Sequence, residues 1–455
     1  MLCAVAERDA YANLLLPATL TERGLGGRDA ALATELTYGT LRGRGTYDAV
    51  LAVCSDRELS TLDPAVREIL RLGTHQLLST RIAPHAAVAT SVDLVRDVVS
   101  PRPAGFVNAV LRRVSARDLE AWLEIAAPAR AEDPEGHLAV RYSHPRWIVT
   151  ALREALGGSL AETEAALAAD GERPAVTLSV VPGLADPADL AEVGAEPARW
   201  SEYGAYLPEG DPAGIAAVAQ GRAGVQDEAS QLAAIALARV PVGDERRGQS
   251  GDQRWLDLCA GPGGKSRLLG GLAAQQSAHL VAAEIRPHRA RLVRSATASA
   301  VTTDGSAATG VVVADGTRPP WAPGSFDRVI ADVPCSGLGA LRRRPEARWR
   351  RSPQAIADPA GLQRQLLTSA LDAARPGGVV AYVTCSPHLA ETRDVLADVL
   401  ATRPGTEVLD APAVLPEVPG LACSDPDRRL AQFWPHRHGT DAIFLALLRV
   451  PSQAG

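Results

Sequence analysis

The stretch Trp255–Ser266, WLDLCAGPGGKS, restricts the fold of this chain more than any other segment. Its first five residues are mostly apolar, as in a buried parallel strand. Glycines follow at positions 261, 263 and 264, where the lack of a side chain lets the backbone turn tightly and approach a ligand. Helix-forming residues come next. We therefore predict a strand, a glycine turn and a helix whose free N–H groups face an anionic ligand group.

Lys265, inside this turn, is the only lysine of the chain, and all the other residues among its 47 lysines and arginines are arginine. In a chain with this bias, an arginine is expected wherever any cation suffices. The lysine therefore indicates that position 265 needs a compact ammonium group and not a planar guanidinium. The alternative is that Lys265 lies on a solvent-exposed helix face, where its presence has no functional reason.

The composition sets limits on the class of protein. A length of 455 residues predicts about three domains. The net charge of −6 means that a nucleic-acid partner would need a local positive surface. No apolar run approaches the ~20 residues of a membrane span, and no signal peptide is evident, so we expect no membrane association. The spacing of the six cysteines favours neither a metal site nor a disulfide framework, and predicts free thiols in the cytoplasm.

The residue patterns divide the chain into three predicted domains. Residues 1–130 have apolar residues at helical spacing and almost no strand pattern, which predicts an all-α bundle. After a Pro/Ala/Glu-rich joint, residues 137–219 suggest a small α+β module. Residues 220–455 alternate strand-like and helical runs, which predicts a doubly wound α/β domain with ligands at the carboxyl ends of its strands. The predicted strands are Trp255–Cys259, Leu280–Ile285, Val311–Ala314, Arg328–Asp332, Gly378–Thr384 and Ile443–Val450.

Four acidic residues fall in or at the ends of successive predicted strands: Asp257, Glu284, Asp315 and Asp332. A carboxylate at the end of the second strand can accept both hydroxyls of a ribose. Four such residues indicate a cofactor that contains a nucleoside. Because the glycine pattern is GPGG and not GxGxxG, a dinucleotide is not favoured, and S-adenosylmethionine fits better.

Two cysteines directly follow neighbouring predicted strands: Cys335 in ADVPCSGLG and Cys385 in YVTCSP. Since neighbouring parallel strands end side by side, we expect the two thiols to meet near the cofactor. Carbon 5 of a pyrimidine takes a methyl group only after a thiolate has added to carbon 6. An acid near ring N3 stabilises the developing charge, and Asp332 is placed for that role. The alternative is that both cysteines are small buried apolar residues.

One local basic run, LRRRPEARWRR at residues 341–351, follows Cys335. Its arginines suit phosphate contacts, and its tryptophan suits base stacking, so we expect it to contact RNA. A solvated helix face is the alternative.

These motifs together resemble the RNA cytosine-5 methyltransferases of the RsmB/Sun type, a likeness carried by DLCAGPGGKS, ADVPCSGLG with LRRRPE, and YVTCS. The amino-terminal ELTYGTLR, LRLGTHQLL, PHAAV and GFVNAVLRR resemble the NusB-like RNA-binding domain of that family, and residues 137–219 correspond to its RRM-like subdomain. The resemblance implies a Rossmann-like catalytic domain, an RNA substrate, most often 16S ribosomal RNA, 5-methylcytosine as the product, and a monomer.

The resemblance also assigns roles to residues. Cys385 would be the attacking nucleophile, and Cys335 would assist release of the product. The residues implied for the S-adenosylmethionine site are Cys259, Ala260, Gly261, Pro262, Gly263, Gly264, Lys265, Glu284, Asp315 and Asp332. The residues expected to contact RNA are Arg112, Arg113, Arg342, Arg343, Arg344, Arg348, Trp349 and Arg350.

Other functions are compatible with parts of this pattern. The helical half could belong to a NusB-like antitermination or assembly factor whose methyltransferase-like domain is silent, although the intact glycine turn argues against that. Methylation of another RNA, such as tRNA, is a second alternative. A DNA cytosine methylase would not need the TCS cysteine, and a small-molecule methyltransferase would need neither paired thiols nor an arginine run.

Overall fold

The computed structural model describes residues 1–8, 10–208, 210–242, 253–302, 305–423 and 428–452. The chain forms two compact units, each with its own core. The first combines Met1–Arg173 with Leu341–Ser352, and the second combines Pro174–Ala340 with Pro353–Gly455.

The first unit is helical throughout its described part, as the sequence predicts for its amino-terminal 130 residues. Helix α5 shows why: Asp63 caps its first turn by accepting from two backbone N–H groups, Pro64 follows at the first helical position, and apolar residues recur on one face. That face packs with α4, α6 and α7 around a core of leucines and valines. The α-helices of the unit are α1 Leu2–Glu7, α2 Ala12–Glu22, α3 Gly27–Arg42, α4 Arg44–Cys54, α5 Pro64–Ser79, α6 Pro84–Val98, α7 Ala104–Val114, α8 Leu119–Ala126, α9 Pro134–Arg141, α10 Arg146–Ala155 and α11 Leu160–Gly171.

The second unit begins with a small antiparallel sheet in the order β2-β3-β1-β4. Its strands are β1 Val176–Val180, β2 Glu196–Pro197, β3 Gly204–Leu207 and β4 Ala223–Val225. The last of these lies beyond residue 219, so the sheet continues past the expected end of the small module. The division into three domains at 1–130, 137–219 and 220–455 stays a prediction.

The larger sheet of the second unit has the strand order β10-β12-β9-β8-β5-β6-β7. Its five strands from β9 to β7 are parallel, and β12 pairs antiparallel with β9. All six predicted strands are present, and β9 begins four residues earlier than expected. The strands are β5 Arg254–Asp257, β6 His279–Glu284, β7 Thr309–Val313, β8 Phe326–Asp332, β9 Ala374–Thr384, β10 Glu407–Leu409, β11 Ala431–Gln432 and β12 Phe444–Arg449.

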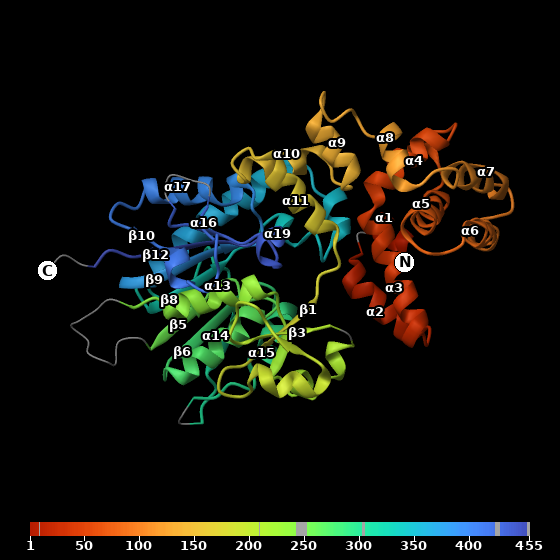
Figure 1. Ribbon diagram of the computed structural model, residues 1–455. Coiled ribbons are helices and arrows are strands. Elements are labelled where there is room, and N and C mark those ends of the chain that lie inside the picture. The colour runs from red at the N-terminus through yellow and green to blue at the C-terminus, as the bar shows by residue number, and fades with distance from the viewer. Residues whose placement is uncertain (9, 209, 243–252, 303–304, 424–427, 453–455) are drawn as a thin grey trace. The chain divides into compact units, whose positions relative to one another are not determined.

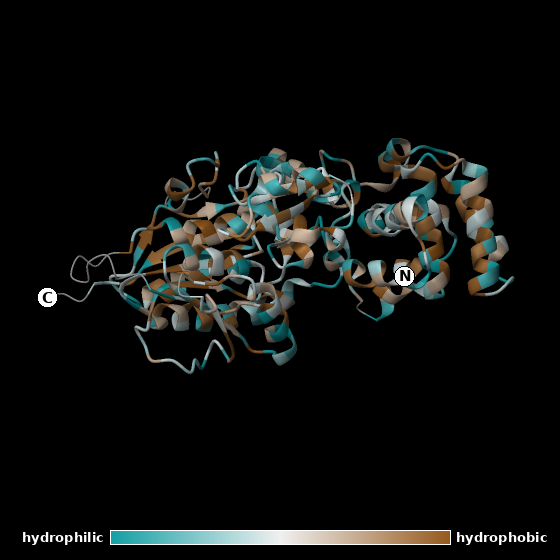
Figure 2. Cartoon of the chain, turned by 90° about the horizontal axis from the view of Figure 1, so that it is seen from below, coloured by the Kyte–Doolittle hydropathy of each residue, from teal (hydrophilic) through white to brown (hydrophobic). Residues whose placement is uncertain are grey.

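Alternation along these strands builds a separate core on each face of the sheet. Trp255 of β5 packs with α13 (Glu228–Arg239) and α14 (Gly264–Gln275) on one face. Leu256 packs with α16 (Ala357–Ala373) and α17 (Arg393–Ala401) on the other. The strands run between these two helix layers (Figure 1), and they are mostly hydrophobic along their length (Figure 2). This arrangement confirms the predicted doubly wound fold.

No helix among the described residues is long and apolar enough to cross a membrane. A group of three or more His, Cys, Asp or Glu side chains placed to hold a metal ion is likewise not found in the part of the chain that the structure describes.

Candidate active site

Two thiols meet at the carboxyl ends of the central strands β8 and β9. The two strands pair in parallel register up to Asp332 and Val383, so the residues that follow them leave the sheet side by side. The Sγ atoms of Cys335 and Cys385 lie 3.1 Å apart. Both cysteines are free, since a disulfide would bring the sulfurs to about 2.05 Å. Hydrogen bonding with Cys385, together with burial, raises the pKa of the Cys335 thiol well above its usual value.

The ammonium group of Lys265 lies beside the strand that leads to Cys335. Its Nζ atom donates to Oδ2 of Asp332 at 2.8 Å and to Oγ of Ser230 at 2.5 Å. Burial lowers the pKa of Lys265, but the charge of Asp332 and its hydrogen bond outweigh burial and raise the pKa above the usual value. The lysine is therefore a buried, charged group, and two neighbours hold it in one place.

The glycine turn after β5 packs tightly against the end of β6. A Cβ atom at Gly261 would lie 1.9 Å from Oε2 of Glu284, so the turn has room for glycine alone. Arg289 donates to the carbonyl oxygen of Gly261, and its Nε atom lies 3.5 Å from Oε2 of Glu284. Gly263 has a φ of 110°, which favours glycine, and it precedes the first residue of α14.

Asp257 and Cys259 lie behind this turn. Asp257 is buried, and its carboxyl group accepts from Oγ of Ser266 at 2.6 Å and from the N–H of Cys259 at 3.3 Å. Burial raises the pKa of Asp257 to about 7. Burial also raises the pKa of Cys259 well above its usual value, which suits a pocket wall and not a nucleophile.

The remaining residues expected at the cofactor site follow the same edge of the sheet. Asp315 comes two residues after β7, and Oδ1 of its carboxylate accepts from the N–H of Thr317 at 2.9 Å and from its hydroxyl at 2.8 Å. Ala260 is buried, whereas Pro262 is exposed. The structure thus links the expected residues into three contacts, which are Gly261 with Glu284, Lys265 with Asp332, and Cys335 with Cys385.

Sequence reasoning missed a buried amide at the glycine turn. Gln226 is buried, and neither its Oε1 nor its Nε2 atom has a hydrogen-bond partner among the described residues. Its Cδ atom would lie 3.7 Å from a Cβ atom at Gly264. A buried amide without partners is costly. The local sequence around it, VQDEAS, gives no signal that marks this residue.

Arg348 is engaged inside the helical unit, and its expected contact with RNA stays a prediction. Its side chain is fully buried within the helical unit and donates to the backbone carbonyls of Arg42 and Ser143 at 3.2 Å and of Asp170 at 2.6 Å. All three acceptors of this guanidinium group belong to the helical unit itself. Its role in the described structure is to join α3, α11 and the segment after α9.

The neighbours of Arg348 are also engaged in the helical unit. Arg350 donates to the carbonyl oxygens of Val5 at 2.8 Å and Ala10 at 2.6 Å. Arg344 lies over the ring of Tyr11, and Trp349 packs beside Arg44. Contact of these residues with RNA stays a prediction. So does that of Arg342, which is buried, of Arg343, which is half-buried, and of Arg112 and Arg113, which are exposed.

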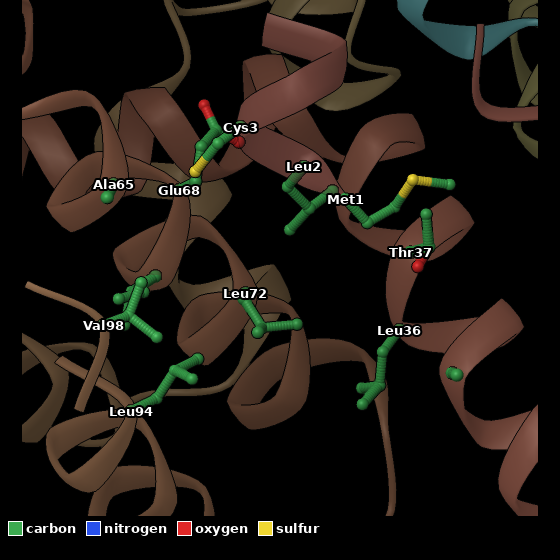
Figure 3. Close-up of a pocket in the computed structure, with 12 residues that line it drawn as sticks. Met1, Leu2, Cys3, Leu36, Thr37, Ala65, Glu68, Leu72, Leu94 and Val98 are labelled. Carbon is green, nitrogen blue, oxygen red and sulfur yellow. The ribbon is translucent and has the colours of Figure 1, made fainter. Parts of the chain in front are cut away.

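A cavity of about 300 Å³ lies among α1, α3, α5 and α6 of the helical unit, and it contains none of the expected site residues (Figure 3). Its walls are mostly apolar, with residues such as Leu36 and Leu72. Its carboxylate, Glu68, is ion-paired with Arg71 at 2.5 Å. The cavity therefore belongs to the helical unit and is separate from the pair of thiols at the ends of β8 and β9.

Known proteins are similar to this chain over almost its whole length. A putative methyltransferase of Mycobacterium tuberculosis is 50% identical over 447 residues, which cover 98% of this chain and 94% of that protein. The ribosomal RNA small subunit methyltransferase B of Pseudomonas putida is 33% identical, over 90% of this chain and 89% of the relative.

Solved structures share the fold. The crystal structure of PH0851 covers 95% of this chain and 93% of its own, with a TM-score of 0.74 and 21% identity. NSun6 from Pyrococcus horikoshii, crystallised with SFG, covers 67% of this chain and 98% of its own, with a TM-score of 0.52 and 16% identity.

Family profiles match both ends of the chain. The profile described as 16S rRNA methyltransferase RsmB/F matches residues 248–449, and the NusB family profile matches residues 1–116. Together with the long alignment to the Pseudomonas protein, these matches show that the chain belongs to the RsmB/F family of ribosomal RNA methyltransferases and carries a NusB-family domain at its amino-terminal end.

Proposed function

We propose that this protein transfers a methyl group from S-adenosylmethionine to carbon 5 of a cytosine in 16S ribosomal RNA. The observation that carries the proposal is the pair of thiols, Cys335 and Cys385, whose sulfur atoms lie 3.1 Å apart at the ends of adjacent strands. Methylation at an exocyclic nitrogen or at a hydroxyl group needs no thiol. A pyrimidine carbon does need one, because it must first be made nucleophilic. The membership of the RsmB/F family supports ribosomal RNA as the substrate.

The residues around the glycine turn fit S-adenosylmethionine. The carboxylate of Glu284, at the end of β6, suits a ribose diol, and the N–H groups at the start of α14 suit a carboxylate. The amide of Gln226 has both a donor and an acceptor left for a ligand, which supports a polar group in this turn. When bound there, the cofactor supplies an electrophilic methyl group.

Cys385 would act as the nucleophile. Its thiolate would add to carbon 6 of the cytosine, which breaks the carbon 5–carbon 6 double bond and makes carbon 5 electron-rich. Once carbon 5 has taken the methyl group, it loses its proton to water, which acts as the base. The electron pair of that C–H bond restores the double bond, and the carbon 6–sulfur bond breaks to return the thiolate.

Lys265, Asp332 and Cys335 would support these steps. The Asp332 carboxyl group would face ring N3, where charge develops during addition, and the Lys265 ammonium that binds it adds a positive charge beside it. Cys335 would assist release, since its sulfur atom is in contact with that of Cys385 and its raised pKa keeps it in the protonated thiol form.

The test is transfer of labelled methyl groups to unmodified 16S RNA by the wild-type protein and by Cys385→Ala. We expect the substitution to lower the rate by roughly a thousandfold or more. Cys3→Ala, which removes a half-buried thiol of the helical unit, is the matched control and should leave the rate unchanged. Full activity of Cys385→Ala would overturn the mechanism.

A further inference from the structure

The turn that carries Cys335 lies outside the sheet, so strand pairing does not hold it. The last ladder contact between the two strands is the hydrogen bond from the N–H of Val333 to the carbonyl oxygen of Val383, at 3.0 Å. The turn is tied again at Gly339, whose N–H donates to the carbonyl oxygen of Cys385 at 2.8 Å. Cys335 and Ser336 lie between these two ties and need another support.

Glu391 supplies that support from a segment that follows Cys385. One carboxylate oxygen accepts from the backbone N–H of Ser336 at 2.7 Å, and the other accepts from the Ser336 hydroxyl group at 2.5 Å. The bonded N–H belongs to the peptide unit that joins Cys335 to Ser336. Because a peptide unit is planar, holding its N–H fixes the direction in which the chain leaves Cys335.

Glu391 is itself held on every side. It is fully buried, its N–H donates to the carbonyl oxygen of His388 at 3.0 Å, and its own carbonyl accepts from the Tyr382 hydroxyl at 2.8 Å. The amide of Gln363 donates to its carboxylate at 3.3 Å and to the carbonyl oxygen of Pro334 at 2.9 Å. Glu391 therefore links strand β9, the segment after Cys385 and the turn of Cys335.

A charged group at this position needs an explanation, because burial of a carboxylate is costly. The three groups that donate to it are neutral, and two of them belong to Ser336. A carboxylate can accept at both oxygens, whereas a glutamine would turn an N–H₂ group toward one of the Ser336 donors. The carboxylate therefore matches the need to hold both donors of one residue.

We propose that Glu391 is a positioning residue that holds the Cys335 turn against Cys385 and so sets the contact between the two thiols. It acts through Ser336 and does not itself touch the RNA. The expected effect on product release rests on the proposed function. The contact between the two thiols can be measured without any substrate.

The first experiment compares the rate at which diamide joins Cys335 and Cys385 in the wild type and in Glu391→Gln. In this reaction two thiols are oxidised to a disulfide and diamide is reduced to its hydrazine, and mass spectrometry after alkylation measures the product. We expect Glu391→Gln to slow the reaction by about tenfold, because the sulfur atoms lose their fixed contact. Ser336→Ala, which removes only the hydroxyl donor, should have the same effect to a smaller extent.

Asp327→Asn is the matched control. Asp327 is a buried carboxyl group at the opposite end of β8, where it accepts from the N–H groups of Gln253 and Arg254 at 2.9 Å. A general loss of stability would change thiol oxidation in both variants. Each protein is measured at the same number of degrees below its own melting temperature. A slower oxidation rate in Glu391→Gln alone supports positioning. Equal oxidation rates in Glu391→Gln and the wild type would overturn it.

The second experiment measures the partition between released product and covalent protein–RNA adduct. We expect Glu391→Gln to accumulate a larger adduct fraction than the wild type and Asp327→Asn, because Cys335 is displaced from Cys385. If the wild type transfers no methyl group to RNA, the proposed function fails, and the oxidation rates still decide whether Glu391 positions the thiols. An unchanged adduct fraction in an active Glu391→Gln protein would contradict the role in release.

Discussion

The Nζ atom of Lys265 lies 2.8 Å from Oδ2 of Asp332, so the only lysine of the chain is ion-paired with the carboxylate that ends the strand before Cys335. The lysine is buried, and the aspartate is about one third exposed, with 31% of its side chain accessible. This pair joins the glycine turn of β5 to the end of β8. This ion pair therefore links the glycine turn to the strand that leads to the two thiols.

Replacement of Lys265 by arginine should impair the enzyme even though the charge is kept. The planar guanidinium is larger than an ammonium group and has no matching space between Ser230 and Asp332. We expect the rate of methyl transfer to fall by about tenfold or more. Arg291→Lys, the reverse exchange at an exposed position of helix α15 (Pro287–Thr297), is the control and should have no effect. Wild-type activity of Lys265→Arg would show that any cation serves at this position.

Loss of the Cys335 thiol should trap the reaction at the covalent stage. Cys335 contacts Cys385 and keeps its thiol proton at neutral pH. Because of this, removal of Cys335 leaves Cys385 covalently bound to the cytosine. We expect Cys335→Ala to form a protein–RNA adduct that survives a denaturing gel, and the double variant Cys335→Ala/Cys385→Ala to form none. A Cys335→Ala protein that turns over without an adduct would remove the release role.

Substitution of Gly261 should block the cofactor site. A Cβ atom there would lie 1.9 Å from the Glu284 carboxylate and 2.9 Å from Nε of Arg289, so Gly261→Ala must push these groups apart. We expect the affinity for S-adenosylhomocysteine, measured by calorimetry, to fall by about tenfold or more. Gly361→Ala, in helix α16 with open space around its Cβ position, is the matched control. Equal affinities of the two variants would contradict the assignment of this turn.

The buried carboxyl group of Asp257 predicts a stability that falls as the pH rises. Its folded pKa of about 7 exceeds the ordinary value of 3.8, so the folded state binds the proton more tightly than the unfolded state does. The free energy of unfolding begins to fall above about pH 4, and the fall is complete above about pH 7. It amounts to roughly 4 kcal/mol. Asp257→Asn should remove this loss, so the variant gains stability relative to the wild type across that range in urea unfolding.

Asp315 provides the control, because its carboxyl group should change the stability with pH in the opposite direction. The N–H and hydroxyl groups of Thr317 hold the pKa of its carboxyl group below the usual value. Its contribution to stability is therefore present above the unfolded pKa and is lost as the pH falls through the folded pKa. Asp315→Asn should lose stability relative to the wild type at neutral pH only. The same pH trend in both variants would contradict the account of Asp257.

Removal of the Arg348 side chain should destabilise the helical unit. The substitution Arg348→Ala leaves the carbonyls of Arg42, Ser143 and Asp170 without this donor in a buried place. We expect a loss of about 3 kcal/mol, measured by hydrogen exchange of amides in α3 and α11. Arg351→Ala removes an exposed arginine of the same segment and should leave the exchange unchanged. Wild-type protection in Arg348→Ala would contradict this structural role of Arg348.

The sequence was sufficient to predict the features that depend on local pattern. Apolar runs predicted the six strands, and because Cys335 and Cys385 each directly follow a strand, their meeting could be predicted from the rule that parallel strands end side by side. The expectation that position 265 needs an ammonium group came from composition, whereas the two partners of Lys265 are known only from the structure.

Features that depend on distant segments could not be predicted in this way. An arginine run looks the same whether it faces solvent or packs inside, and only the tertiary structure brings the carbonyls of Arg42 and Asp170 to Arg348. Glu391 lies 55 residues from Ser336, and no local pattern pairs them. That the Gln226 amide has no hydrogen-bond partner among the described residues can be recognised only when its surroundings are known.

The most direct test of the central claim is methyl transfer from labelled S-adenosylmethionine to unmodified 16S RNA, followed by digestion of the RNA to nucleosides. The account predicts that the label is found in 5-methylcytidine at a single site and disappears with Cys385→Ala. Label in any other nucleoside, or tight RNA binding without transfer, would contradict it, and the second result would favour an RNA-binding assembly factor.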